Sequence, residues 1–313
     1  MAGSKNVKTT KRILILGITS IIGYRFYKLN NHFEVFGLCR NWHEKTDKNI
    51  FQISDLDDKT IKSKIMIIKP DVIINCIGLG NLDECEKKSL IAQKINQDFP
   101  IRVLNICLKL DIKLVHFSTS MVYDGLRSFY TEKMALSPIN IYGKLKANTD
   151  KLFIKNINNK NLLLRPTTII GFKEQFQRDN PASFILNKVY LNESILLVND
   201  IKTNFLFLDD FIEIIKILID KNVYGYFNVG GNEILSRYDL GSRIIKLLQL
   251  KKFNYKSVSS SQFKSLAERP KNLFLNNNKL LKKIIFNFTP LDSALKQIIL
   301  ETIKKNVWDF RTN

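Results

Sequence analysis

The sequence predicts an α/β protein in which a doubly wound parallel sheet is joined by a smaller, interleaved C-terminal lobe. Short aliphatic runs alternate with amphipathic segments through the first half of the chain, which is the pattern of strands covered by helices on both faces. The pattern loosens after about Gly171, yet no linker-like tract separates the halves. The 313 residues are enough to bury the core of such a two-lobed unit.

The first half supplies five strands and three helices. Each predicted strand is a nearly continuous run of β-branched or aliphatic residues, as expected for parallel strands. Each predicted helix keeps apolar residues at helical spacing. The strands are expected at 12–16, 34–39, 72–77, 113–118 and 162–166, and the helices at 22–29, 59–68 and 89–110.

The second half is expected to form the smaller lobe and to return in part to the sheet. Asn180-Pro181 precedes an apolar helical run, and Asp209-Asp210 is expected to cap a later helix. The division is a loose basic tail at 1–11, a first domain at 12–171 and a lobe at 172–313, of which about 199–231 rejoins the first domain. Strands are expected at 195–198, 205–208 and 226–229, and helices at 211–219, 238–248 and 291–303.

The formal net charge is +20, which raises the question of nucleic-acid binding. The lysines are scattered along the chain, and no RNP, zinc-finger or basic-helix signature is present. This argues against specific binding of nucleic acid. The positive field still attracts anionic ligands such as nucleotides.

Hydropathy indicates the cellular compartment, and the spacing of the cysteines indicates whether a disulfide or metal site is expected. No apolar run reaches the roughly 18 residues that a membrane span needs, and the run behind the basic N-terminus is too short for a signal peptide. We therefore expect a cytoplasmic protein that does not enter a membrane. The cysteines form no C-x-x-C pair, so we expect reduced thiols and neither a disulfide framework nor a metal site. They are Cys39, Cys76, Cys85 and Cys107.

A glycine loop, GITSIIG, lies between the first strand and the first helix. Gly17 permits the tight turn out of the strand, and Gly23 lets the helix pack close to the sheet. The helix N-terminus then offers free N–H groups and a partial positive charge to a pyrophosphate. Ser20 stands where a middle glycine is usual, and its hydroxyl can donate to a phosphate. In this context the loop predicts a Rossmann-type dinucleotide-binding domain over residues 12–171.

The end of the second strand indicates which dinucleotide is bound. A NAD site typically carries an acidic residue here for the ribose 2′-hydroxyl, but the strand ends Leu38-Cys39-Arg40-Asn41. The Arg40 guanidinium can pair with a 2′-phosphate, although a solvated surface arginine would look the same. The sequence therefore favours NADPH, with NADH as the alternative.

Tyr142 and Lys146 are four residues apart, so they share one face of a helix. A neighbouring ammonium would lower the pKa of the phenol, which could then pass a proton to a carbonyl oxygen that receives hydride. The spacing alone arises by chance in many helices. Thr119 follows a strand about twenty residues earlier, at the edge where open α/β sheets bind ligands, and can donate to the same oxygen.

These motifs resemble the extended short-chain dehydrogenases/reductases, and among them the dTDP-4-dehydrorhamnose reductase family. The resemblance rests on GITSIIG, NCIGLGNLDECE, STSMVYDG, SPINIYGKLK, LLLRPTTIIG, NFLFLDDF, FNVGGNEILSRYDL and RPKNLFLNNNKL. It implies that Thr119, Tyr142 and Lys146 are catalytic. It implies cofactor contacts from Gly17, Thr19, Ser20, Ile21, Ile22, Gly23, Arg40, Asp55, Leu56, Cys76, Ile77, Gly78, Tyr142 and Lys146, and substrate contacts from Ser120, Met121, Asn180, Lys202 and Arg269.

The residues after Thr119 narrow the reaction that the resemblance implies. Related dehydratases need an Asp-Glu pair there, and epimerase–reductases place a cysteine near Met121; Ser120-Met121 supplies neither, and a thioether has no proton to give. The implied reaction is reduction of the C4 ketone of a nucleotide-linked 4-keto-6-deoxyhexose, which yields a donor such as dTDP-L-rhamnose for glycan assembly. Arg269 is a candidate phosphate partner or one half of a surface salt bridge.

Two alternative functions and one candidate protein partner are left by the sequence. The chain also resembles the regulatory β subunit of methionine adenosyltransferase, a cofactor-binding protein that serves a partner enzyme. A nucleotide-sugar epimerase is the other alternative. A second copy of the chain is a candidate partner.

Overall fold

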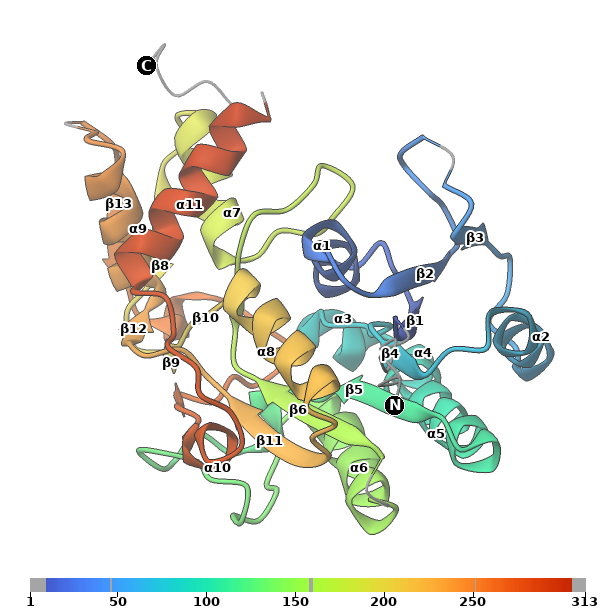
Figure 1. The fold of residues 1–313 in the computed structure, drawn as a ribbon. Helices are drawn as coiled ribbons and strands as arrows, with labels where there is room; N and C mark the ends of the chain where they lie inside the picture. The colour runs from blue at the N-terminus through green and yellow to red at the C-terminus, as the bar shows by residue number, and fades with distance from the viewer. Residues whose placement is uncertain (1–9, 46, 158–159, 251, 306–313) are drawn as a thin grey trace.

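The computed structural model describes residues 10–45, 47–157, 160–250 and 252–305. A parallel sheet at its centre consists of β1 (Arg12–Leu16), β2 (Glu34–Cys39), β3 (Ile50–Gln52), β4 (Val72–Asn75), β5 (Lys113–Phe117), β6 (Leu162–Pro166) and β11 (Gly225–Val229) (Figure 1). The strand order is β11-β6-β5-β4-β1-β2-β3, and each neighbouring pair is parallel. This confirms the predicted doubly wound sheet.

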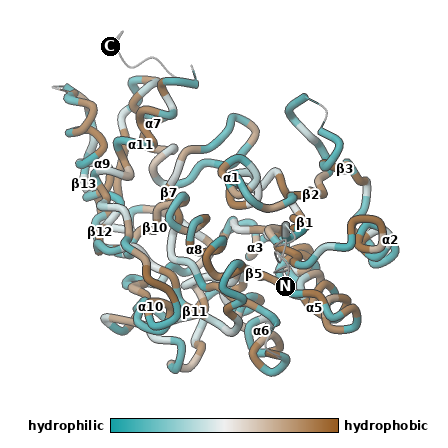
Figure 2. The backbone as a smooth tube through the Cα atoms, in the orientation of Figure 1, coloured by the Kyte–Doolittle hydropathy of each residue, from teal (hydrophilic) through white to brown (hydrophobic). Residues whose placement is uncertain are grey.

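Helices cover both faces of the sheet. They are α1 (Ile21–Leu29) and α8 (Leu208–Asp220) on one face, and α2 (Asp58–Ile68), α5 (Phe99–Leu110) and α6 (Ile141–Lys155) on the other. Ile13 and Ile15 of β1 enter the first core, and Leu14 and Leu16 enter the second. A continuous apolar strand therefore serves two cores, because successive side chains point to opposite faces. Figure 2 shows hydrophobic and hydrophilic stretches alternating along the covering helices.

The smaller lobe has an apolar core of its own (left in Figure 1). It contains α7 (Pro181–Tyr190), α9 (Arg237–Leu247), α11 (Leu291–Lys304), β7 (Ile169–Ile170), β8 (Ile195–Val198), β9 (Lys202–Asn204), β10 (Leu206–Phe207), β12 (Ile234–Ser236), β13 (Tyr255–Val258) and β14 (Asn272–Leu273). Its small sheets mix parallel and antiparallel pairs. The short helix α10 (Asn278–Leu281) instead lies against β11 and packs Leu280 into the first core. Because β11 extends the central sheet and α8 covers it, the two halves of the chain interleave.

Only the last part of the predicted N-terminal tail lies within the described residues. Residues 1–9 of the predicted tail lie outside the described residues, whereas the Lys11 ammonium donates to the Ile219 carbonyl at 2.6 Å and so lies against α8. None of the helices in the described ranges has the length and apolar character that crossing a bilayer requires.

The predicted cap of α8 is wrong. The helix begins at Leu208, the N-cap residue is Phe207, and no side chain caps it. Asp209 and Asp210 lie inside the first turn, where carboxylates favour the positive end of the helix dipole. Asp209 pairs with Arg25 of α1 at 2.6 Å, so its charge joins α8 to α1.

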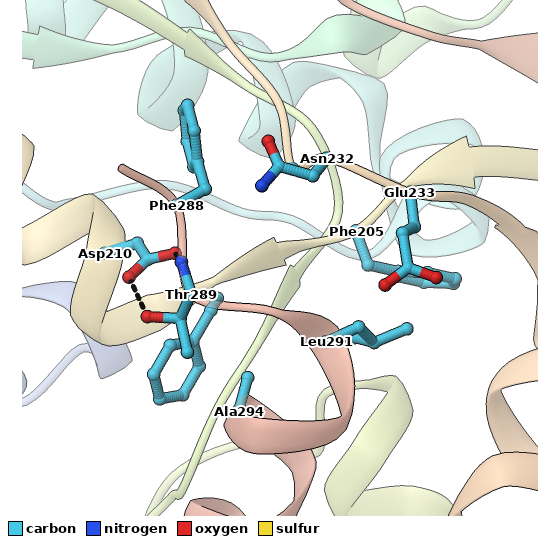
Figure 3. A pocket seen from close by; sticks show the side chains of 10 residues that line it. Phe205, Asp210, Asn232, Glu233, Phe288, Thr289, Leu291 and Ala294 are labelled. Carbon is cyan, nitrogen blue, oxygen red and sulfur yellow. Dashed lines mark hydrogen bonds between the residues drawn. The ribbon is translucent and has the colours of Figure 1, made fainter. Parts of the chain in front are cut away.

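Asp210 joins α8 to the segment that leads into α11. Its carboxylate accepts from Thr289 N at 2.9 Å and from Thr289 Oγ1 at 2.6 Å (Figure 3). The neighbouring pocket, bordered by Phe205 and Phe288, has a volume of about 10 Å³. That is roughly the space of one water molecule. We interpret it as a structural joint, since no predicted site residue lines it.

The single helix expected at 89–110 is interrupted. It consists of α4 (Ser89–Gln93), a π-helical turn at Lys94–Asp98 and α5. Pro100 lacks the N–H of a continuous ladder, and it occupies the first turn of α5. The π turn carries the buried Asn96. Such turns occur often at functional sites.

Candidate functional site

The glycine loop has the geometry of an anion-binding turn. Gly17 has φ +80°, and a Cβ on Gly23 would lie 2.9 Å from the Gly17 carbonyl oxygen, so both positions require glycine. Ser20 caps α1 by accepting from Gly23 N at 3.0 Å. Ile21 and Ile22 belong to the first turn, whose N–H groups have no acceptor within the helix. These residues fit the pyrophosphate of a dinucleotide.

A segment that was not predicted to belong to the site covers this loop. Gln177 Nε2 donates to the carbonyl oxygens of Thr19 at 3.1 Å and Ser20 at 3.3 Å. The adjacent Phe176 ring meets the edge of Tyr24 and stacks on His43, with centroids 5.4 and 4.5 Å apart. The segment 172–179 thus ties the glycine loop to the loop after β2. Contacts between residues so far apart in the chain leave no local pattern in the sequence.

The loop after β2 leaves Arg40 facing solvent. Glu44 pairs with Lys28 of α1 at 2.8 Å, and the phenols of Tyr24 and Tyr27 donate to Glu44 and Asp47. The carboxylates of the loop are therefore engaged by α1, and Arg40 is exposed at the end of β2. This arrangement suits a 2′-phosphate better than a ribose hydroxyl.

The other predicted cofactor residues follow the carboxyl ends of neighbouring strands. Asp55 is exposed and Leu56 half-buried in the loop between β3 and α2. Cys76, Ile77 and Gly78 follow β4 directly. A Cβ built on Gly78 would lie 3.9 Å from the Lys146 ammonium, so this loop adjoins the Tyr–Lys helix.

Asn96 fixes the next part of that loop and was not predicted. Its Oδ1 accepts from Leu79 N at 2.9 Å, and its Nδ2 donates to Leu79 O at 3.0 Å. The residue is fully buried. Asn96 lies among Lys94, Gln97 and Asp98, so the sequence gives no signal that this amide is buried and needs specific partners.

The structure brings Thr119, Tyr142 and Lys146 together at the carboxyl edge of the sheet. The Thr119 hydroxyl lies near enough to the Tyr142 phenol to lower its pKa, and it accepts from Met121 N at 3.2 Å. A Cβ on Gly143 would lie 2.2 Å from the Met121 carbonyl oxygen, which shows how closely α6 packs on the turn after Thr119. The catalytic roles of these residues stay predictions.

The expected lowering of the Tyr142 pKa is wrong for this pocket. Burial raises the pKa of the phenol to about 12, although the nearby Thr119 hydroxyl and the charge of Arg178 oppose the rise. The Lys146 ammonium instead donates to the Phe117 carbonyl at 2.8 Å. Burial lowers the Lys146 pKa to about 8. At neutral pH the phenol therefore keeps its proton and can act as a donor, while Lys146 is mainly charged.

Three predicted substrate residues lie in a turn or at a helix N-terminus, where they also have structural roles. The turn Ser120–Val122 places buried Ser120 and half-buried Met121 directly after Thr119. Asn180 caps α7: its Oδ1 accepts from Ala182 N, and its Nδ2 donates to Gly171 O at 2.8 Å. The Asn180 amide is thus held by the backbone.

The predicted cations of the substrate lobe lie on separate segments. Lys202 is exposed at the start of β9. Of the two roles predicted for Arg269, the structure shows the salt bridge: its guanidinium pairs with Asp83 of α3 (Leu82–Lys87) at 3.2 Å. Arg237, which was not predicted, is exposed, and partial desolvation of its guanidinium together with the nearby Arg269 charge lowers its pKa. Within the described residues Arg237 has no ion-pair partner, so its guanidinium is available to an anion, whereas Arg269 is engaged by Asp83.

The four thiols are free. Cys39, Cys85 and Cys107 are buried and Cys76 is partly exposed. Burial raises the pKa of Cys76 to about 12, so this thiol beside the glycine loop is protonated. No group of three or more His, Cys, Asp or Glu side chains suited to a metal occurs in the described part of the chain.

The sheet, the glycine loop and the Tyr–Lys helix define an extended short-chain dehydrogenase/reductase fold. A family model described as the RmlD substrate binding domain matches residues 11–303, so the chain belongs to this family.

Relatives of the chain carry two different names. It is 24% identical over 311 residues to the methionine adenosyltransferase 2 subunit beta of Mus musculus, covering 96% of this chain and 90% of that protein. It is 26% identical over 306 residues to the dTDP-4-dehydrorhamnose reductase of Aggregatibacter actinomycetemcomitans, covering 92% and 98%. The dTDP-4-dehydrorhamnose reductase of Bacillus anthracis in complex with NADP superimposes with a TM-score of 0.81 at 24% identity, covering 94% and 100%.

Proposed function

We propose that the protein is an NADPH-dependent reductase of the C4 ketone of a nucleotide-linked 4-keto-6-deoxyhexose. The observation that carries this proposal is that the Thr119 hydroxyl lies near enough to the Tyr142 phenol to lower its pKa, with Lys146 one helical turn away on α6. Two hydroxyl groups beside a cation suit a carbonyl oxygen that gains negative charge. The smaller lobe and its exposed Arg237 suit the diphosphate of the substrate.

The proposed chemistry divides among the three side chains. When bound, the dinucleotide would supply the hydride. Thr119 orients the substrate carbonyl by donating to its oxygen, and Tyr142 donates its proton to the same oxygen. The Lys146 ammonium stabilises the phenolate that remains. The turn directly after Thr119 supplies no group to remove a ring proton, since Ser120 and Met121 occupy it.

The first test is a panel of 4-keto sugar nucleotides carrying dTDP, UDP or GDP, assayed with NADPH and with NADH. We expect oxidation of NADPH that depends on the ketone, followed by its absorbance. Ring protons should not exchange with deuterated water, which separates a reductase from an epimerase. Absence of turnover with every ketone would contradict the proposal.

Replacing Arg40 with Ala should weaken NADPH binding about tenfold or more, because a hydrogen bond to a charged group contributes roughly 1.5–3 kcal/mol. NADH serves as the matched control ligand, since it lacks the 2′-phosphate. Its affinity should stay the same in the variant. Equal loss for both dinucleotides, measured by fluorescence titration, would show that Arg40 does not read the 2′-phosphate.

A second candidate function is a cofactor-binding subunit of a synthetase. The similarity to the methionine adenosyltransferase 2 subunit beta over 96% of the chain favours it. The glycine loop would then bind a dinucleotide without turnover. Co-purification of a synthetase, together with no ketone-dependent oxidation of NADPH, would support this candidate. For either function a cytoplasmic location and a homodimer remain our predictions.

A further inference from the structure

A buried series of charges runs inward from Tyr142 along α6. Tyr142, Lys146 and Asp150 follow at intervals of four residues, so they lie on one face of the helix. Asp150 Oδ2 accepts from Arg165 Nε of β6 at 2.7 Å, and neither side chain is more than 1% exposed. A cation, an anion and a second cation therefore lie behind the phenol.

Arg165 engages only part of the Asp150 carboxylate. The Arg165 Nη1 atom donates to the Tyr123 hydroxyl at 3.0 Å, and its Nε takes one Asp150 oxygen. The other oxygen, Oδ1, is buried without a hydrogen bond in the described chain, as is the Ser118 hydroxyl. Ser118 is near enough to lower the Asp150 pKa, but its geometry falls short of a hydrogen bond. Unpaired buried oxygens are rare and demand an explanation.

We infer that Asp150, held in place by Arg165, is a positioning residue that keeps Lys146 charged inside the pocket. Arg165 is always protonated, so the series of Lys146, Asp150 and Arg165 carries a net charge of about +1. Asp150 therefore stabilises the protonated form of Lys146, while the three groups together still present a positive charge to Tyr142. The inference rests on the proposed function for the role of Tyr142, whereas the charge state of Lys146 is independent of it.

The other groups that face Lys146 do not supply this negative charge. From β5, His116 is fully buried, and burial and Lys146 hold its pKa well below its usual range, so it is neutral. From α3, the Cys85 thiol is neutral because burial raises its pKa to about 11. On α6 itself, Tyr142 keeps its proton. Burial raises the Asp150 pKa too, but the adjacent Arg165 opposes this rise and favours the carboxylate.

The test is a pH titration of the full-length protein by NMR, with lysines labelled at 13Cε. Lys146 is assigned from its missing signal in Lys146→Arg. We expect Asp150→Asn to lower the Lys146 midpoint by about one pH unit or more, because an opposite charge favours the protonated form. Lys113 is the internal control: burial lowers its pKa to about 8 as well, with Lys11 as the second cause. The Lys113 midpoint should not move.

Further variants separate charge from packing. Asp150→Glu should restore the Lys146 midpoint, and Asp150→Asn should move the alkaline limb of the kcat profile to lower pH with little change in the KM for NADPH. If Asp150→Asn does not fold, the wild-type protein still decides: the Lys146 signal should shift a second time at the acidic midpoint of the Asp150 carboxyl carbon. An unchanged Lys146 midpoint in folded Asp150→Asn, or no second shift in the wild type, would overturn the inference. Because the titration uses no ketone, failure of the proposed function would appear separately, as absence of turnover.

Discussion

Replacement of Tyr142 by Phe is expected to lower kcat for ketone reduction by about 10²–10⁴-fold, the usual contribution of a positioned proton donor. The variant removes one oxygen and leaves the ring, so α6 and its packing should be preserved. The lost oxygen is the one that lies near the Thr119 hydroxyl. Because burial holds the Tyr142 pKa at about 12, the phenol is protonated at neutral pH and has a proton to donate.

NADPH affinity and the unfolding midpoint should change little in Tyr142→Phe, since the glycine loop and the core are untouched. Tyr255→Phe provides a matched control. Tyr255 packs on Tyr238 in the smaller lobe with ring centroids 5.8 Å apart, and its variant should retain wild-type turnover. Full turnover by Tyr142→Phe would eliminate the phenol as the proton donor, and with it the reductase proposal in its present form.

The parts of the fold that were predicted are those with a local signature. The apolar runs of β1, β2 and β6 mark the strands to the residue, because parallel strands are apolar on both faces. The spacing of Tyr142 and Lys146 and the order of Gly17 and Gly23 are equally local. Such patterns are visible in one short window of sequence.

The parts that were missed depend on distant contacts. Gln177 reaches Thr19 across 158 residues, and Arg165 meets Asp150 from a different element. The Tyr142 pKa was mistaken for a related reason: spacing on a helix showed the ammonium nearby, but only the folded pocket shows that burial outweighs it and that Lys146 turns to the Phe117 carbonyl.

Gly143→Ala is expected to lower the free energy of unfolding by about 1–3 kcal/mol, the usual cost of overpacking. An alanine inside a helix normally gains roughly 1 kcal/mol over glycine. Here its Cβ would lie 2.2 Å from the Met121 carbonyl oxygen, a backbone atom that cannot rotate away. Either α6, which carries Tyr142, or the turn after Thr119 must move, and we expect this to displace the two hydroxyls relative to one another.

Activity should therefore fall together with stability in Gly143→Ala. A displacement of about 1 Å can cost roughly a hundredfold in rate, and we expect a loss of that order in kcat. Gly80→Ala is the matched control for stability, because a Cβ there meets no atom within 4 Å. Urea unfolding of both variants measures the difference. A Gly143→Ala protein with the midpoint and kcat of the wild type would show that the close packing of α6 does not set the geometry of the site.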